Sequence, residues 1–138
     1  MQLWEYSVER LRDDGEFVLY RARANDGAPS SVLLLAPASA RPRHETLQKI
    51  DHEFSLRSEL DPAWAVRPLA VSERSEQVVL VLEDPGGETL DAVISRGMGI
   101  PQFLRFAVGL AAALAGLHDR KLIHKDVKPA NVLFLFLK

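Results

Sequence analysis

The residues with the clearest chemical potential stand in the segment HKDVKPAN, residues 124–131. It brings a carboxylate, an ammonium group and a side-chain amide together within a short polar stretch between apolar runs. A carboxylate can orient a hydroxyl group and take its proton, while an ammonium group can compensate charge on a phosphoryl group. An amide oxygen suits Mg²⁺, a hard cation that prefers oxygen ligands. These residue types suit the transfer of a charged group, and the alternative is a polar helix-to-strand turn with a chance spacing.

This segment resembles the catalytic loop of protein kinases, whose pattern is His-x-Asp-x-Lys-Pro-x-Asn, and the preceding GLHDRKLIHKD is similar to the kinase helix end that leads into it. The resemblance implies that Asp126 is the catalytic base and that Lys128 compensates charge on the transferring phosphoryl group. It implies Asn131 as a Mg²⁺ ligand and His124 as a structural residue of the loop. A lysine at position 128 is the serine/threonine-type form of the loop.

The resemblance covers nearly all of the chain, but only the first half of a kinase domain. It implies an α+β fold with a protein-kinase-like N-lobe, a small antiparallel sheet plus helix C, at residues 1–83. A hinge at 84–88 would lead into a partial helical C-lobe at 89–138. That part would hold a short helix, a long helix at 101–119 and the catalytic loop at 124–131, and we expect it to be truncated there.

The hydrophobic pattern predicts a matching order of elements. Apolar runs separated by turn residues indicate two hairpins, with strands at 17–22 and 32–35 and then at 65–71 and 77–82. A helical stripe runs between the hairpins and ends at Asp61-Pro62, because a residue before proline avoids the α region. Thr89 is a plausible N-cap of the short helix. The long helix begins at Pro101 and repeats apolar residues at helical spacing, so one broad face should be buried.

The nucleotide-covering loop implied by the resemblance departs from the family pattern. The family has three glycines in six positions, whereas the segment RDDGEF has Gly15 alone and out of register. Backbone amides can approach a phosphate beside one glycine, but Asp13, Asp14 and Glu16 would repel the anion. An ordinary acidic turn between strands is the alternative.

The family's strand lysine is missing. Leu35, or Leu34 if the register slips by one residue, stands at its position in the segment VLLL. Leucine cannot hold phosphates, and it cannot pair with Glu53, which lies near the position of the family's helix C glutamate. We therefore expect Glu53 to face solvent or to pair with another cation: Arg21, Arg43 or Lys49. A compensating cation for the phosphates could come from the neighbouring strand, from Arg21 or Arg23.

The hinge carries a third departure. Counted from Glu83, Pro85 falls where the family's backbone N–H donates to adenine, and proline has no N–H. One neutral hydrogen bond contributes about 1 kcal/mol, so its loss weakens nucleotide binding without forbidding it. The resemblance implies ATP and Mg²⁺ as cofactors, but these departures argue against their binding by this chain.

Two functions stay open. One is a serine/threonine protein kinase that transfers a phosphoryl group from ATP, although we expect the isolated chain to be inactive. The other is a non-catalytic, pseudokinase-like module that binds a partner or nucleotide within a larger sensor protein. The phrases ELDPAWAVRPLAV and LVLEDPGGETLD resemble the N-terminal kinase-like domain of bacterial hybrid sensor histidine kinases. That resemblance favours the remainder of a larger signalling chain as the partner.

Composition argues against several other classes of function. The net charge of −2 over 138 residues shows no electrostatic footprint for nucleic acid, and cysteine is absent, which excludes disulfides and thiolate metal sites. The first ten residues do not form a signal peptide, and the stretch FAVGLAAALAGL is too short to span a bilayer, so we expect a cytoplasmic protein without membrane contact. In a complete kinase domain further helices would cover much of the apolar stripe from Phe103 to Leu117, so we expect exposed apolar surface on this chain and self-association through it.

Overall fold

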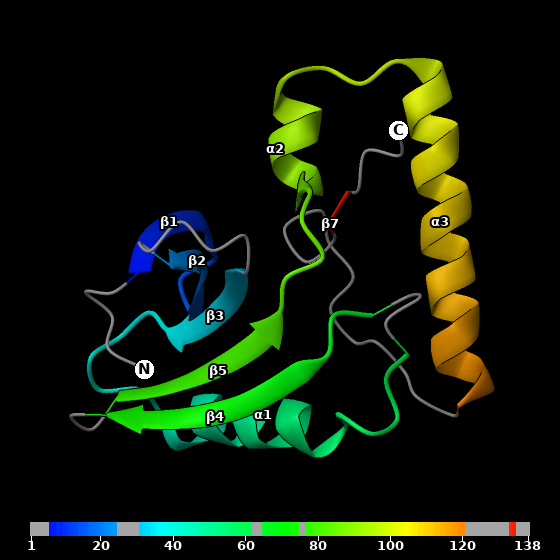
Figure 1. Cartoon of the computed structure of the whole chain (residues 1–138). Coiled ribbons are helices and arrows are strands. Elements are labelled where there is room, and N and C mark those ends of the chain that lie inside the picture. The colour runs from blue at the N-terminus through cyan, green and yellow to red at the C-terminus, as the bar shows by residue number, and fades with distance from the viewer. Residues whose placement is uncertain (1–5, 25–30, 62–64, 75–76, 121–132, 135–138) are drawn as a thin grey trace. The chain divides into compact units, whose positions relative to one another are not determined.

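The computed structural model describes the chain apart from residues 1–5, 25–30, 62–64, 75–76, 121–132 and 135–138. The chain divides into two compact units. The first comprises Met1–Ser58 and Val66–Asp84, and the second comprises Glu59–Ala65 and Pro85–Lys138. Figure 1 shows the sheet of the first unit and the helices of the second.

The first unit is built on a five-stranded antiparallel sheet in the order β1-β2-β3-β5-β4 (Figure 1). Its strands are β1 (Tyr6–Asp13), β2 (Phe17–Ala24), β3 (Ser31–Pro37), β4 (Pro68–Arg74) and β5 (Gln77–Glu83). Both predicted hairpins are confirmed, since β2 pairs with β3 and β4 pairs with β5. The hydrophobic pattern did not assign β1, whose described side chains before residue 11 are exposed.

The two faces of the sheet follow from its register. Leu34 lies opposite Val81 and, with Ala22, forms a buried cluster on one face. Arg21 lies opposite Leu33, so these two side chains share the other face, because residues paired across strands point the same way. Leu33 is only 1% exposed, so the apolar strand centres are covered on both faces.

Helix α1 (His44–Ser55) packs against β4 and β5 (Figure 1). Ile50 is its fully buried anchor, and Thr46 is 4% exposed. The helix ends earlier than the predicted stop at Asp61-Pro62. Its last turn tightens at Leu56, whose backbone N–H donates to the carbonyl oxygen of Glu53 at 3.2 Å.

The described residues of the second unit form two short strands and two helices. Strand β6 (Glu88–Thr89) pairs with β7 (Leu133–Phe134), and α2 (Leu90–Ser95) follows β6 directly. Thr89 does occupy the N-cap position of α2, but its side chain makes no capping hydrogen bond. Helix α3 (Ile100–Asp119) carries its proline in the first turn, as predicted.

A buried face on α3 is not observed among the described residues, whereas the expected exposed apolar surface is. None of its residues is buried, and its most exposed apolar residue, Ile100, is 75% exposed. Helical spacing shows that a helix has an apolar face, but it does not supply the element that covers this face. The expectation that the apolar stretch is too short for a bilayer also needs correction. Helix α3 has 20 residues, and its length and composition alone would allow it to cross a membrane, a test that core helices of soluble proteins also pass.

Candidate functional site

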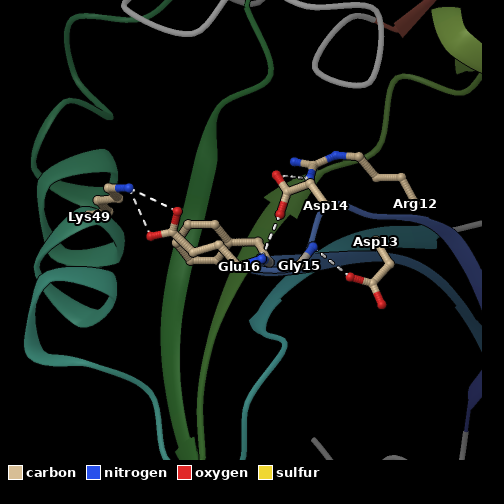
Figure 2. A network of polar contacts seen from close by, with 7 residues as sticks. Arg12, Asp13, Asp14, Gly15, Glu16 and Lys49 are labelled. Atoms are coloured by element: carbon tan, nitrogen blue, oxygen red, sulfur yellow. Dashed lines mark hydrogen bonds and ion pairs between the residues drawn. The ribbon is translucent and has the colours of Figure 1, made fainter.

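The candidate nucleotide loop is a tight turn between β1 and β2 (Figure 2). Its backbone amides point at carboxylates of the turn itself. The Gly15 N–H donates to Asp13 Oδ1 at 2.9 Å, while Asp14 Oδ1 accepts from Glu16 N–H at 3.0 Å and from Phe17 N–H at 2.8 Å. Gly15 has a φ of 89°, a left-handed conformation that glycine adopts without strain. Three consecutive amides are therefore satisfied within the turn.

Arg12 closes the turn from the β1 side. Its Nη1 donates to Asp14 Oδ2 at 2.9 Å, and the Arg12 and Asp14 side chains are only 11% and 18% exposed. The Asp14 carboxylate thus accepts from a guanidinium through one oxygen and from backbone amides through the other. A carboxylate with such partners holds the turn shape strongly, because charge-assisted hydrogen bonds exceed neutral ones in strength.

Glu16 reaches from the turn to helix α1 (Figure 2). Both of its carboxylate oxygens accept from Lys49 Nζ, at 2.8 and 2.9 Å, and Oε1 also accepts from Thr46 Oγ1 at 3.2 Å. Hydrogen bonding to the Lys49 ammonium, against a smaller opposing effect of burial, holds the pKa of Glu16 below its ordinary value. The turn is therefore tied to α1 by an ion pair in which the helix supplies the cation.

The position of the missing lysine carries no charge in either register. Leu35 lies opposite Leu19 and Leu80, whereas Leu34 lies on the other sheet face, opposite Tyr20 and Val81. Both alternatives leave an apolar side chain at the place of the family's phosphate-binding cation.

Glu53 faces solvent, which was one of the two expected outcomes. Its carboxylate has no hydrogen-bond or ion-pair partner within the part of the chain that the structure describes. The expected cationic partners are used elsewhere or stay apart: Lys49 binds Glu16, and Arg21 binds Asp84. No strand-to-helix pair of the family type forms among these residues.

Arg21 belongs to a buried network near the hinge. Its Nε donates to Asp84 Oδ2 at 2.7 Å and its Nη2 donates to Asp84 Oδ1 at 3.0 Å, so the ion pair is bidentate. The hydroxyl of Ser31 donates to Asp84 Oδ2 at 2.5 Å. The Arg21 and Asp84 side chains are only 7% and 2% exposed. A cation held in this way is not available to phosphates, so the expectation of rescue by Arg21 is not supported, and Arg23 is exposed.

A second, more exposed ion pair lies just before the hinge, at the end of β5. Arg67 donates through Nη2 to Glu83 Oε1 at 2.8 Å, and the Glu83 backbone N–H donates to the Arg67 carbonyl oxygen at 3.0 Å. The hinge residue Pro85, which lacks an N–H, is exposed. The Glu83 side chain therefore stabilises the strand before the hinge.

The described residues do not fit the phosphates of ATP. The amides of Gly15, Glu16 and Phe17 already donate to carboxylates, and Leu35 replaces the strand cation. Carboxylates at the turn repel an anion at the distance where amides would attract it. The predicted catalytic-loop residues His124, Asp126, Lys128 and Asn131, the last of them the predicted Mg²⁺ ligand, lie outside the described residues.

Sequence reasoning missed both polar networks. It treated Asp84 only as part of the hinge and gave Thr46 and Ser31 no role. One signal was present in the sequence: Arg21 shares the period-two face of Leu19 in a strand that was predicted to lie within the sheet. A charged residue on such a face needs a buried partner, but the sequence does not say which acidic residue lies across the sheet.

The fold defines the class of this protein. A five-stranded antiparallel sheet with one helix across it, followed by a helical section, matches solved kinase domains. The PknI kinase domain of Mycobacterium tuberculosis superposes with a TM-score of 0.66 at 21% sequence identity, over 96% of this chain and 56% of that one. At this identity the likeness shows the fold alone.

The chain belongs to the protein kinase domain family, which matches residues 25–136. A probable myosin light chain kinase of Dictyostelium discoideum is 31% identical over 87 residues, which are 62% of this chain and 18% of that protein. Sucrose non-fermenting protein kinase 1 of Fusarium virguliforme is 25% identical over 130 residues, 93% of this chain and 19% of that protein. A serine/threonine-protein kinase, PknD of Protochlamydia amoebophila, is 28% identical over 82 residues, 58% of this chain and 8% of that protein. This chain therefore spans about half of a solved kinase domain and a minor part of each of these relatives.

Proposed function

We propose that this kinase-family chain is a non-catalytic, pseudokinase-like module that binds a protein partner or the remainder of a larger signalling protein. The observation that carries the proposal is Leu35 at the lysine position together with a solvent-facing Glu53. Phosphoryl transfer depends on positioning and charge stabilisation of the nucleotide phosphates. In the family, the strand lysine and the helix C glutamate that pairs with it supply both. The backbone amides of the β1–β2 turn, which donate to the turn's own carboxylates, support the same function.

Thermal unfolding of the 138-residue chain with millimolar ATP·Mg²⁺ tests this proposal. We expect no shift in Tm for the unmodified chain. A nucleotide at a hundredfold its Kd would add about 2.7 kcal/mol to the free energy of unfolding, which is readily measured. The variant Leu35→Lys restores the missing cation, and Leu35→Met is its matched control of similar length. A Tm increase with ATP·Mg²⁺ in the unmodified chain would overturn the proposal.

A second candidate is ATP-dependent phosphoryl transfer to protein serine or threonine, with Mg²⁺ as the metal. The segment with Asp126, Lys128 and Asn131 favours it, because these are the residue types that the reaction needs. Incubation of the purified chain with radiolabelled ATP and a general protein substrate distinguishes the two candidates. We expect no incorporation; incorporation that disappears in Asp126→Asn would establish the second candidate instead.

The resemblance to bacterial hybrid sensor histidine kinases supports a cytoplasmic setting within a longer signalling protein. It is carried by LVLEDPGGETLD, which includes the hinge. The direct test is the encoding genome: a reading frame that continues from this segment into further kinase, ATPase-like and histidine-kinase regions would support this setting. A frame without any such regions would contradict it.

Self-association is the last part of the proposal. Ile100, Leu104 and Val108 recur at four-residue spacing on α3 and are 75%, 56% and 70% exposed. An apolar stripe of this kind favours contact with another apolar surface. Sedimentation velocity should show association that weakens in Leu104→Gln/Val108→Gln, and a monomeric unmodified chain would contradict it.

A further inference from the structure

The β1–β2 turn and helix α1 are joined by an ion pair of reversed polarity. In the family pattern set out above, the sheet supplies a lysine and the helix supplies a glutamate. Here the sheet side supplies Glu16 and the helix supplies Lys49, with both carboxylate oxygens within 2.9 Å of Nζ. Lys49 stands one helical turn before Glu53, so the cation lies on the same helix side as the Glu53 carboxylate, which has no partner among the described residues.

The turn that presents Glu16 is fixed before any ligand arrives. Asp14 accepts the Glu16 and Phe17 amides through one oxygen and the Arg12 guanidinium through the other. The Glu16 main chain is thereby held in place, so the pair with Lys49 can form without further ordering of the turn backbone. The Thr46 hydroxyl, on a residue only 4% exposed, adds a third contact to the Glu16 carboxylate.

We propose that the acidic β1–β2 turn acts as a built-in substitute for bound phosphate. The carboxylates of Asp13 and Asp14 take the turn amides, and Glu16 latches the turn to Lys49, so that α1 is positioned on the sheet without nucleotide. The latch goes beyond the proposed function, since it concerns the nucleotide-free chain and is measured there. The Glu16–Lys49 pair would therefore hold α1 in the same position on the sheet whether or not ATP is present.

A double-mutant cycle on the 138-residue chain tests the latch, with amide hydrogen exchange of α1 as the readout and no nucleotide present. We expect Glu16→Gln and Lys49→Met each to raise the exchange rates of the α1 amides about two- to fivefold, the range that an exposed ion pair supports. The double variant should exchange no faster than either single variant, because the same contact is lost only once. Lys49→Arg should keep the slow exchange.

Two controls match the charge changes without touching the latch. Glu9→Gln removes an exposed carboxylate from β1, and Asp51→Asn removes an exposed carboxylate from α1 that is not spaced to contact Lys49. Both should leave the exchange of α1 unchanged. The charge reversal Glu16→Lys/Lys49→Glu should restore slow exchange if the two side chains meet. Additive effects of the single variants, or a reversal that exchanges faster than both of them, would overturn the proposal.

The amides provide a separate readout. Asp14→Ala should speed exchange at the Glu16 and Phe17 amides, whereas Asp91→Ala in α2 should not affect them. Unchanged protection at both amides would show that Asp14 does not hold the turn and would overturn the phosphate-substitute part. A failure of the proposed function, seen as ATP binding by the unmodified chain, would leave these nucleotide-free results as they are, so the two failures are distinguishable.

Discussion

Two ionic networks of similar chemistry lie in different surroundings, one at Arg21 within β2 and one at the turn that precedes β2. Near the hinge, Arg21 and Asp84 expose only 7% and 2% of their side chains. At the turn, Lys49 and Glu16 expose 59% and 32% of theirs. Water screens the exposed pair and can replace either partner, whereas the buried pair leaves an uncompensated charge when one partner is lost. Loss of one partner should therefore destabilise the fold strongly at the hinge network and only slightly at the turn network.

The largest expected effect comes from breaking the hinge network. Asp84→Ala should lower the free energy of unfolding by about 3–5 kcal/mol, because the buried Arg21 guanidinium loses its counter-charge. Urea denaturation of the variant against the unmodified chain measures the difference.

The matched control replaces both charges at once. Arg21→Met/Asp84→Asn nearly keeps the side-chain volumes, removes both charges and leaves an amide oxygen to accept from Ser31, so we expect a stability close to that of the unmodified chain. If Asp84→Ala lowers the free energy of unfolding by less than about 1 kcal/mol, the hinge network behaves like a surface ion pair. The distinction between the hinge network and the turn network would then be wrong.

A smaller effect is expected at the turn itself. Gly15→Ala forces a Cβ into a backbone with a φ of 89°, although no atom lies within 4 Å of that Cβ. The cost should be about 1–2 kcal/mol from backbone conformation alone. Gly109→Ala is the control, since a glycine within α3 should yield about 0.5–1 kcal/mol of stabilisation on replacement. Equal responses of the two variants in thermal unfolding would contradict the described turn conformation.

The smallest effect concerns the pH dependence of the latch. The pKa of Glu16 is lowered in the folded chain, chiefly by Lys49, from an ordinary value of 4.5. Glu16 therefore stabilises the fold above that value, and this stabilisation disappears as the pH falls through the lowered pKa. The unmodified chain should exceed Glu16→Gln by about 0.2–1 kcal/mol at neutral pH and by nothing at strongly acidic pH. Denaturant unfolding across this range measures the difference, and a gap that widens on acidification would contradict the latch.

The fold could largely be predicted where one apolar pattern dominates. The strand predicted at 77–82 is β5, and the helix expected from Pro101 is α3. Strand β1 was not assigned because it is an edge strand with Ser7 and Glu9 exposed, so it lacks the apolar run that marks a covered strand. The exposure of α3 could not be foreseen from its periodicity, since the pattern describes the helix and not its surroundings.

Some features of the candidate site could likewise be predicted from the sequence, and others could not. The absence of a cation at Leu35 and of an N–H at Pro85 follows from residue type, so the sequence was sufficient there. The destination of Arg21 was not predictable, because its partner Asp84 stands 63 residues away and becomes a neighbour only through the pairing of β2, β3 and β5. The sequence likewise offered Lys49 as a partner for Glu53, whereas the structure pairs it with Glu16.

The sequence by itself determined the family, the positions that lack catalytic chemistry and the acidic character of the β1–β2 turn, because these depend on the identity of residues. Only the tertiary structure decided that the turn carboxylates satisfy the turn amides and that Glu16 reaches α1. Ion pairs between distant segments depend on which side chains the sheet register brings within about 3 Å, and hydrophobic patterning does not encode that choice. The same charges that were expected only to repel a phosphate are used in the folded chain to hold the turn and the helix.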